Sequence, residues 1–133
     1  SIEVPYLFNI ETHPTVFQMV SEVTGSVPNN LDCTELLKRT FPGASVTGAP
    51  KIRAMQIIDE LEPVERSVYC GGIGYIGFDN SMRMSMAIRI MIALKQNLYI
   101  PVGGGIVYDS DPEQEYEETL HKANATFKSL GIN

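Results

Sequence analysis

The feature that most constrains the fold is the spacing of short polar turns through residues 69–102. A glycine-rich, β-branched run at residues 69–78 is followed by the turn Asp79-Asn80-Ser81, and an alternating run at residues 82–94 by the turn Lys95-Gln96-Asn97. A third apolar run covers residues 98–102. Turns this short join antiparallel strands, because parallel strands need a long crossover connection. The pattern therefore predicts an antiparallel meander of three strands.

Helix signals lie on both sides of this meander. Asp32 or Thr34 can cap a helix that runs through residue 39, and Pro50 fits the first turn of a helix that ends near Leu61. A last helix is expected over residues 112–130, with Asp111 before it and Gly131 after it. Alternating residues 15–24 favour a further strand, whereas residues 1–10 are expected to be a connecting segment. The predicted fold class is α+β.

Charge and composition exclude several classes of protein. The chain has 133 residues and a net charge of −6, so its surface repels phosphate backbones and a nucleic acid partner is not expected. No apolar run is long enough to span a membrane. Cys33 and Cys70 lack a Cys-x-x-Cys spacing, which favours reduced thiols and a cytoplasmic location. Because the sequence opens on Ser1 rather than Met, we expect it to be cut from a longer protein, with a processed start as the alternative.

An acidic segment at residues 109–118 opens the last helix. Acidic side chains are favourable at the start of any helix, which is one explanation for them. Glu115 and Glu118 are three residues apart and share one helix face, and Lys122 follows on the same face. Two neighbouring carboxylates can bind Mg²⁺, which prefers oxygen ligands. Lys122 is either a surface partner of Glu118 or a contact for an anionic ligand.

Two other features permit both a structural and a functional interpretation. Arg89 stands in an apolar run, where a charge must be paired, reach water, or clamp a carboxylate in a cavity. The glycines at positions 103–105 follow a strand, and they form either a tight turn or a backbone surface close to an anion. His13 and His121 lie at no zinc-ligand spacing, so we expect both on the surface.

Three stretches resemble signature motifs of the chorismate-binding enzyme family. They are FPGASVTGAPKIRAM at residues 41–55, YCGGIGYI at residues 69–76, and GGGIV at residues 103–107 followed by DSDP and by Glu115, Glu118, Thr119 and Lys122. The motifs occur in order, with compatible spacing, over nearly the whole chain. The resemblance implies a large α/β sandwich with antiparallel or mixed β-sheets and outer helices, of which residues 1–133 are the C-terminal half of one domain.

The resemblance also assigns roles to individual residues. Glu118 matches a Mg²⁺ ligand of the family, and Glu115 matches a carboxylate beside that metal. The residues that match substrate-binding groups are Ser45, Tyr69, Arg89, Gly103, Gly104, Gly105 and Lys122. No catalytic residue is expected within this chain, because the family's nucleophilic lysine and its general acid fall upstream of it. The chain alone is therefore expected to be inactive.

Within the family, Ser45-Val46-Thr47-Gly48 resembles the form found in aminodeoxychorismate synthases. These enzymes replace a ring hydroxyl of chorismate with ammonia from a glutamine amidotransferase subunit, on the route to p-aminobenzoate and folate. Gln18 stands where anthranilate synthases carry a histidine, and Ile90 stands where Thr is common. Anthranilate synthase component I is the alternative, and a non-catalytic domain that keeps the fold is another. Retention of Tyr69, Arg89, Glu115, Glu118 and Lys122 argues against the latter, because a decayed site should lose its costly charges first.

Overall fold

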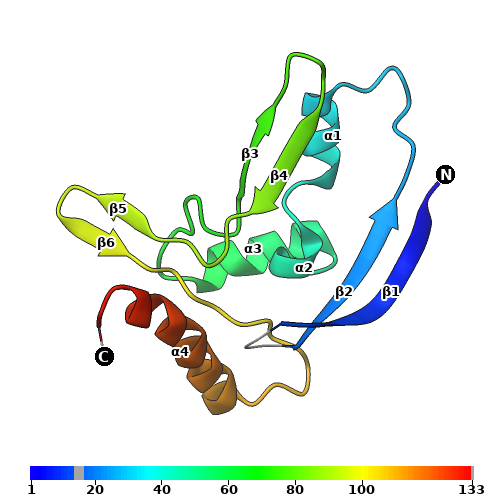
Figure 1. Cartoon of the computed structure of the whole chain (residues 1–133). Coiled ribbons are helices and arrows are strands. Elements are labelled where there is room, and N and C mark those ends of the chain that lie inside the picture. Colours follow the sequence, from blue (N-terminus) through cyan, green and yellow to red (C-terminus); the bar gives the residue numbers. More distant parts are fainter. Residues whose placement is uncertain (14–16, 133) are drawn as a thin grey trace. The chain divides into compact units, whose positions relative to one another are not determined.

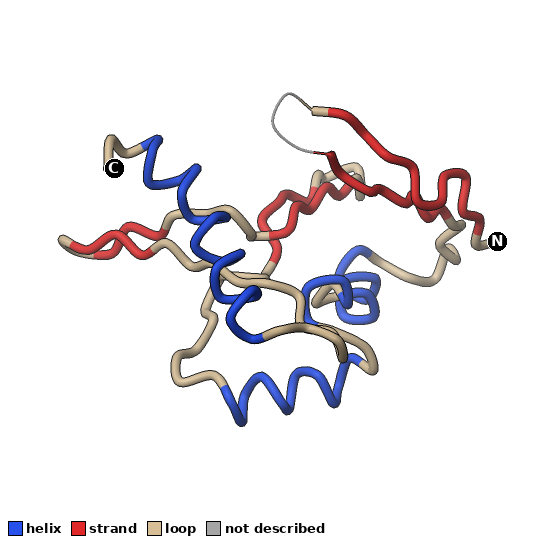
Figure 2. The backbone as a smooth tube through the Cα atoms, turned by 90° about the horizontal axis from the view of Figure 1, so that it is seen from below, coloured by secondary structure: helices blue, strands red, loops and turns tan. Residues whose placement is uncertain are grey.

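A computed structural model describes residues 1–13 and 17–132 of the chain. The chain divides into two compact units, Ser1–Leu36 and Leu37–Asn133, which are considered separately. Figure 1 shows the order of the elements, and Figure 2 separates helices from strands by colour. Helices and antiparallel strand pairs both occur, in agreement with the predicted α+β class.

The first unit contains a hairpin of β1 (Glu3–Thr12) and β2 (Phe17–Thr24). The prediction of a connecting segment over residues 1–10 is wrong, because most of this stretch pairs with β2. Pro5 falls within a register shift between Glu3 and Tyr6, an irregularity of the kind at which proline is tolerated in a strand. The predicted strand over residues 15–24 is confirmed from residue 17 onward, and residues 14–16 lie outside the described residues.

The predicted helix boundaries agree closely with the structure. Helix α1 (Cys33–Thr40) contains the boundary between the units, and Asp32 Oδ1 accepts the Glu35 N–H at 2.8 Å. Helix α3 (Lys51–Leu61) begins after Pro50. In α4 (Pro112–Ser129), Asp111 Oδ1 accepts the Gln114 N–H at 3.0 Å, and Gly131 follows with φ of 71°. The single turn α2 (Ala44–Thr47) was not predicted, because it is too short to show helical periodicity.

The predicted meander is correct in its antiparallel pairing and wrong in its continuity. Strand β3 (Gly72–Ile76) pairs with β4 (Met82–Met86), and β5 (Ile92–Leu94) pairs with β6 (Asn97–Tyr99). The long strand expected over residues 82–94 stops at Met86. Ala87 still exchanges hydrogen bonds with Cys70 and Gly71, but Arg89 then adopts a φ of 55° in the left-handed region. This change of direction separates the two hairpins, so the described residues of this unit form two sheets of two strands each.

The buried apolar side chains of the described residues are few and small. Cys70, Ala87 and Ala123 are 7, 0 and 2% exposed, and many larger apolar side chains are accessible. Cys70 and Ala87 are joined by a backbone hydrogen bond of 3.0 Å, which places this buried point where β4 ends. Among the described residues, none of the helices combines the length and the apolar character that crossing a membrane requires.

Candidate functional site

A cavity of about 910 Å³ lies within the second unit. Its walls come from α2, the segment between α3 and β3, the segment between β4 and β5, strands β5 and β6, the segment after β6, and one side of α4. All seven residues predicted to bind a substrate line this cavity, namely Ser45, Tyr69, Arg89, Gly103, Gly104, Gly105 and Lys122. The fold thus brings together residues that are up to 77 positions apart in the sequence.

Tyr69 lies directly against the glycine segment. A Cβ atom added to Gly103 would stand 3.0 Å from the Tyr69 hydroxyl oxygen, which is closer than side chains normally pack. Burial, and then the neighbouring Cys70, raise the pKa of the Tyr69 hydroxyl above its ordinary value. The hydroxyl is therefore protonated at neutral pH and can donate a hydrogen bond beside the exposed backbone of Gly103.

Lys122 connects α4 to the same glycine segment. Its Nζ donates to the carbonyl oxygen of Gly103 at 3.5 Å, and it forms an ion pair with Glu118 one turn earlier in the helix. The hydrogen bond from Lys122, followed by its positive charge, lowers the pKa of Glu118. Both expectations for Lys122 are therefore compatible with its position, since it pairs with Glu118 and also lines the cavity.

Arg89 contributes a guanidinium group to the larger cavity. It is exposed, and it makes no hydrogen bond or ion pair with residues 1–13 or 17–132. A guanidinium in a cavity with no internal partner keeps its planar set of donors for a carboxylate. Its backbone lies in the left-handed region, which is uncommon for a residue other than glycine and recurs at functional sites.

Glu115 and Glu118 share a smaller, adjoining cavity of about 260 Å³ at the start of α4. Ser110 Oγ donates to Glu115 Oε1 at 2.5 Å. The other oxygen, Oε2, is close to the glycine segment, because a Cβ atom added to Gly104 would stand 3.0 Å from it. The two predicted metal-binding carboxylates therefore open into one space instead of pointing to opposite sides of the helix.

The donor chemistry of this smaller cavity fits Mg²⁺. Carboxylate oxygens are hard ligands, and Mg²⁺ commonly binds through one or two of them while keeping waters and substrate oxygens. Among residues 1–13 and 17–132, no group of three or more His, Cys, Asp or Glu side chains is placed to hold a metal. Glu115 and Glu118 would therefore be part of a ligand set and not the whole of it.

Several residues in or beside these cavities were not predicted. Arg66 binds Glu62 through two hydrogen bonds of 2.8 and 2.6 Å, and both line the larger cavity. The hydrogen bond from Arg66 lowers the pKa of Glu62. Pro63 stands between the two, so their four-residue spacing gave no helical signal. Ser110 was also missed, because a hydroxyl before a helix normally indicates only a cap.

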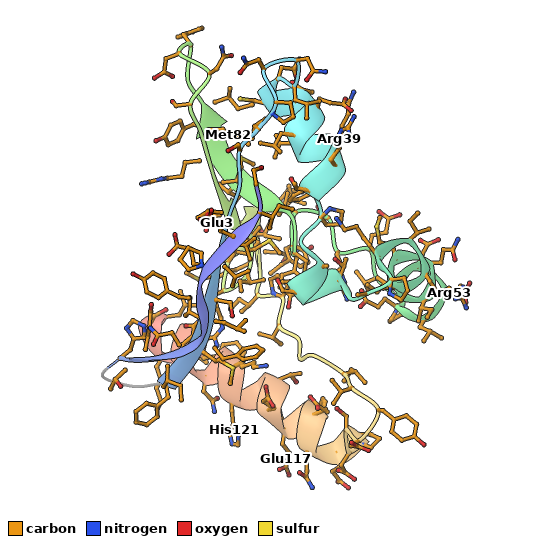
Figure 3. All side chains as sticks on the ribbon, turned by 90° about the vertical axis from the view of Figure 1, so that its right-hand side faces the viewer. Glu3, Arg39, Arg53, Met82, Glu117 and His121 are labelled. Carbon is orange, nitrogen blue, oxygen red and sulfur yellow. The ribbon has the colours of Figure 1, made fainter. Side chains whose placement is uncertain are left out.

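The two histidines lie on the surface, as predicted. His13 is exposed and stands 3.5 Å from the Glu11 carboxylate, and His121 is exposed on α4. Figure 3 shows His121 and Glu117 together along one side of that helix. Neither His121 nor Glu117 lines the two cavities described above.

Comparison with known proteins gives consistent matches across the chain. A profile described as chorismate binding enzyme matches residues 1–128. Aminodeoxychorismate synthase component 1 of Salmonella typhimurium is 51% identical over 130 residues, covering 98% of this chain and 29% of the relative. Anthranilate synthase component 1 of Aquifex aeolicus is 44% identical over 132 residues, covering 99% and 27%. The chain thus spans less than a third of these relatives.

Solved structures show the same relationship. Anthranilate synthase component I from Streptococcus pneumoniae superposes with a TM-score of 0.87 at 43% identity, covering 92% of this chain and 28% of the other. A putative 2,3-dihydroxybenzoate-specific isochorismate synthase from Bacillus anthracis gives a TM-score of 0.88 at 28% identity, covering 100% and 36%. The predicted fold class is therefore confirmed, since the chain folds like a segment of chorismate-utilising enzymes.

Proposed function

The chain belongs to the chorismate binding enzyme family, and on that premise we propose that it is the C-terminal half of a chorismate-binding domain from an aminodeoxychorismate synthase large subunit. The proposed reaction is the amination of chorismate to 4-amino-4-deoxychorismate. The observation that carries the proposal is that the seven predicted substrate-binding residues line one cavity.

The charges around this cavity suit a small dicarboxylate. The chain as a whole carries a net charge of −6, so an anionic substrate needs a local cluster of donors. Arg89 and Lys122 supply two cations, Tyr69 supplies a protonated hydroxyl, and the glycine segment supplies close backbone. We assign the substrate carboxylates of chorismate to these groups, with Arg89 as the forked clamp.

Mg²⁺ is the proposed cofactor, with Glu115 and Glu118 among the residues that hold it. The ion would offset the negative charge of the ring carboxylate during the reaction. In this proposal Lys122 keeps Glu118 ionised and places it beside the larger cavity. The nucleophilic lysine, the general acid and a further metal ligand are assigned to sequence outside this chain. Ammonia is assigned to a glutamine amidotransferase partner, in the cytoplasm, on the route to folate.

Anthranilate synthase component I is the second candidate. It is favoured by the 44% identity to the Aquifex aeolicus enzyme and by the likeness to the Streptococcus pneumoniae structure. Against it stand the Ser45-Val46-Thr47-Gly48 sequence and Gln18, both of which depart from the anthranilate synthase pattern.

The identity of the product separates the two candidates. The full-length protein that carries this segment is incubated with chorismate, Mg²⁺ and ammonium, and the products are identified by liquid chromatography with mass detection. We expect 4-amino-4-deoxychorismate. Anthranilate as the product would favour the second candidate, and unchanged chorismate would overturn the proposal. Residues 1–133 alone are expected to give no turnover, because the groups assigned to the chemistry lie outside them.

A further inference from the structure

Ser110 occupies a fixed position just before α4. Its backbone N–H donates to the Val107 carbonyl at 3.1 Å, and its Oγ accepts the Val107 N–H at 3.1 Å. The hydroxyl is therefore held by the backbone of its own turn, and it does not depend on a flexible side chain for its placement.

The direction of the Ser110 proton follows from these contacts. A serine hydroxyl has one proton to donate and lone pairs to accept with. Since Oγ accepts from Val107, its proton is free to go to Glu115 Oε1, which is 2.5 Å away. A hydrogen bond from a hydroxyl to a carboxylate at this separation is of the strong, charge-assisted kind.

As a consequence, the two carboxylate oxygens of Glu115 have different surroundings. Oε1 is held by Ser110, while Oε2 faces Gly104, where a Cβ atom would stand 3.0 Å away. Glu118 is held differently, since its partner is the cation Lys122. A neutral hydroxyl orients a carboxylate and leaves its negative charge in place. A lysine orients the carboxylate and also offsets its charge.

We propose that Ser110 is a positioning residue that orients the Glu115 carboxylate, so that Oε2 is available to a divalent cation between α4 and the glycine segment. This inference rests on the proposed function, because it deepens the role assigned there to Glu115. Ser110 touches neither substrate nor metal in this account. Its effect passes through the hydrogen bond to Glu115.

The test is a measurement of cation affinity in the full-length protein. Mn²⁺ is used as the probe, and its binding is followed by electron paramagnetic resonance and by calorimetry without substrate. Ser110→Ala should weaken Mn²⁺ binding by about tenfold, the lower end of the effect of removing a partner that orients a metal ligand. Ser110→Thr keeps the hydroxyl and should bind Mn²⁺ within about threefold of the wild type.

Two controls distinguish orientation from a general loss of structure. Ser129→Ala removes the same atom from the far end of α4, where the hydroxyl donates to the Thr126 carbonyl, and should leave Mn²⁺ affinity unchanged. In a Glu115→Gln background, Ser110→Ala should produce no further loss, because the residue through which it acts is already altered. If Ser110→Ala unfolds the protein, Ser110→Cys replaces it in both comparisons, because a thiol has a similar size and is a much weaker hydrogen-bond donor.

The inference is overturned if Ser110→Ala binds Mn²⁺ as the wild type does, if Ser110→Thr fails to restore binding, or if the wild type binds no Mn²⁺. Product identification is carried out on the same preparations. A wild type that makes 4-amino-4-deoxychorismate while Ser110→Ala keeps full Mn²⁺ affinity rejects this inference alone. Loss of affinity in Ser110→Ala without any chorismate conversion by the wild type rejects the proposed function alone.

Discussion

Two glutamate–cation pairs stand at the candidate site, and both have a spacing of four residues. Glu62 and Arg66 lie in the segment between α3 and β3, and two hydrogen bonds join them. Glu118 and Lys122 lie on α4, where Lys122 also donates to the Gly103 carbonyl. The side chains of Glu118 and Lys122 are 54 and 30% exposed, against 37 and 26% for Glu62 and Arg66.

The same spacing therefore produces two different kinds of pair. The planar fork of Arg66 matches the carboxylate of Glu62 and occupies both of its oxygens. The ammonium of Lys122 is a point charge with three donors, and it leaves one oxygen of Glu118 unused by the pair. We interpret the first pair as closed and structural, and the second as open to a metal ion and an anionic ligand.

The largest predicted effect comes from Glu118→Gln in the full-length protein. The change removes the negative charge with little change in volume, and kcat/KM should fall on the order of 100-fold, the scale of one lost preorganised electrostatic contact. Glu117→Gln is the matched control, because Glu117 directly precedes Glu118 in the sequence and lines neither cavity. Near-normal turnover in Glu118→Gln, or equal losses in both variants, would exclude the metal-binding role.

A smaller effect is expected when Arg89 is replaced by lysine, and the same replacement of Arg66 serves as its control. Arg89→Lys keeps the charge but loses the forked contact, and KM for chorismate should rise about tenfold. Arg66→Lys makes the same change in the same cavity. It should leave KM within about twofold of the wild-type value, because Arg66 is already paired with Glu62. Steady-state kinetics with varied chorismate decides between the two, and a larger effect at Arg66 would reverse their assigned roles.

Removal of the closed pair should affect stability more than catalysis. Arg66→Met leaves Glu62 without its partner, and the free energy of unfolding should fall by less than about 1 kcal/mol, since both side chains are partly exposed. Urea denaturation of the full-length protein measures the change. A fall in kcat/KM above about tenfold with unchanged stability would show that Arg66 belongs to the substrate site.

The smallest effect concerns pH. Arg66 lowers the pKa of Glu62 in the folded state, so the pair contributes stability above the unfolded pKa and loses it as pH falls through the folded pKa. The difference in unfolding free energy between wild type and Arg66→Met should therefore shrink as pH falls from about 5 to 3. A difference that stays constant over this interval would show that the ion pair is not its source.

How much the sequence predicts varies between residues for physical reasons. Asp32, Asp111 and Pro50 act locally at helix ends, so they predict α1, α3 and α4 well. The break at Arg89 was missed, because apolar alternation continues past it and nothing local encodes its left-handed backbone. Strand β1 was missed because Pro5 indicates a break, whereas a register shift accommodates it.

The candidate site divides in the same way. Residue patterns placed Glu115, Glu118 and Lys122 on one helix face and left Arg89 and the glycines at 103–105 open between a structural and a functional role. The resemblance to a family supplied the complete set of predicted substrate-binding residues, and these line the cavity. Neither source indicated Ser110 or the Glu62–Arg66 pair. Both depend on turns whose geometry brings together side chains that no periodic pattern relates.

Calorimetric titration of chorismate into the full-length protein distinguishes an open Glu118–Lys122 pair from a closed Glu62–Arg66 pair. Lys122→Met and Arg66→Met are compared with the wild type, since each removes one cation from the same cavity. We predict that Lys122→Met raises the Kd for chorismate at least about tenfold, while Arg66→Met stays within about twofold. Equal weakening in both variants, or weakening in Arg66→Met alone, would show that Lys122 is not the cation that binds chorismate.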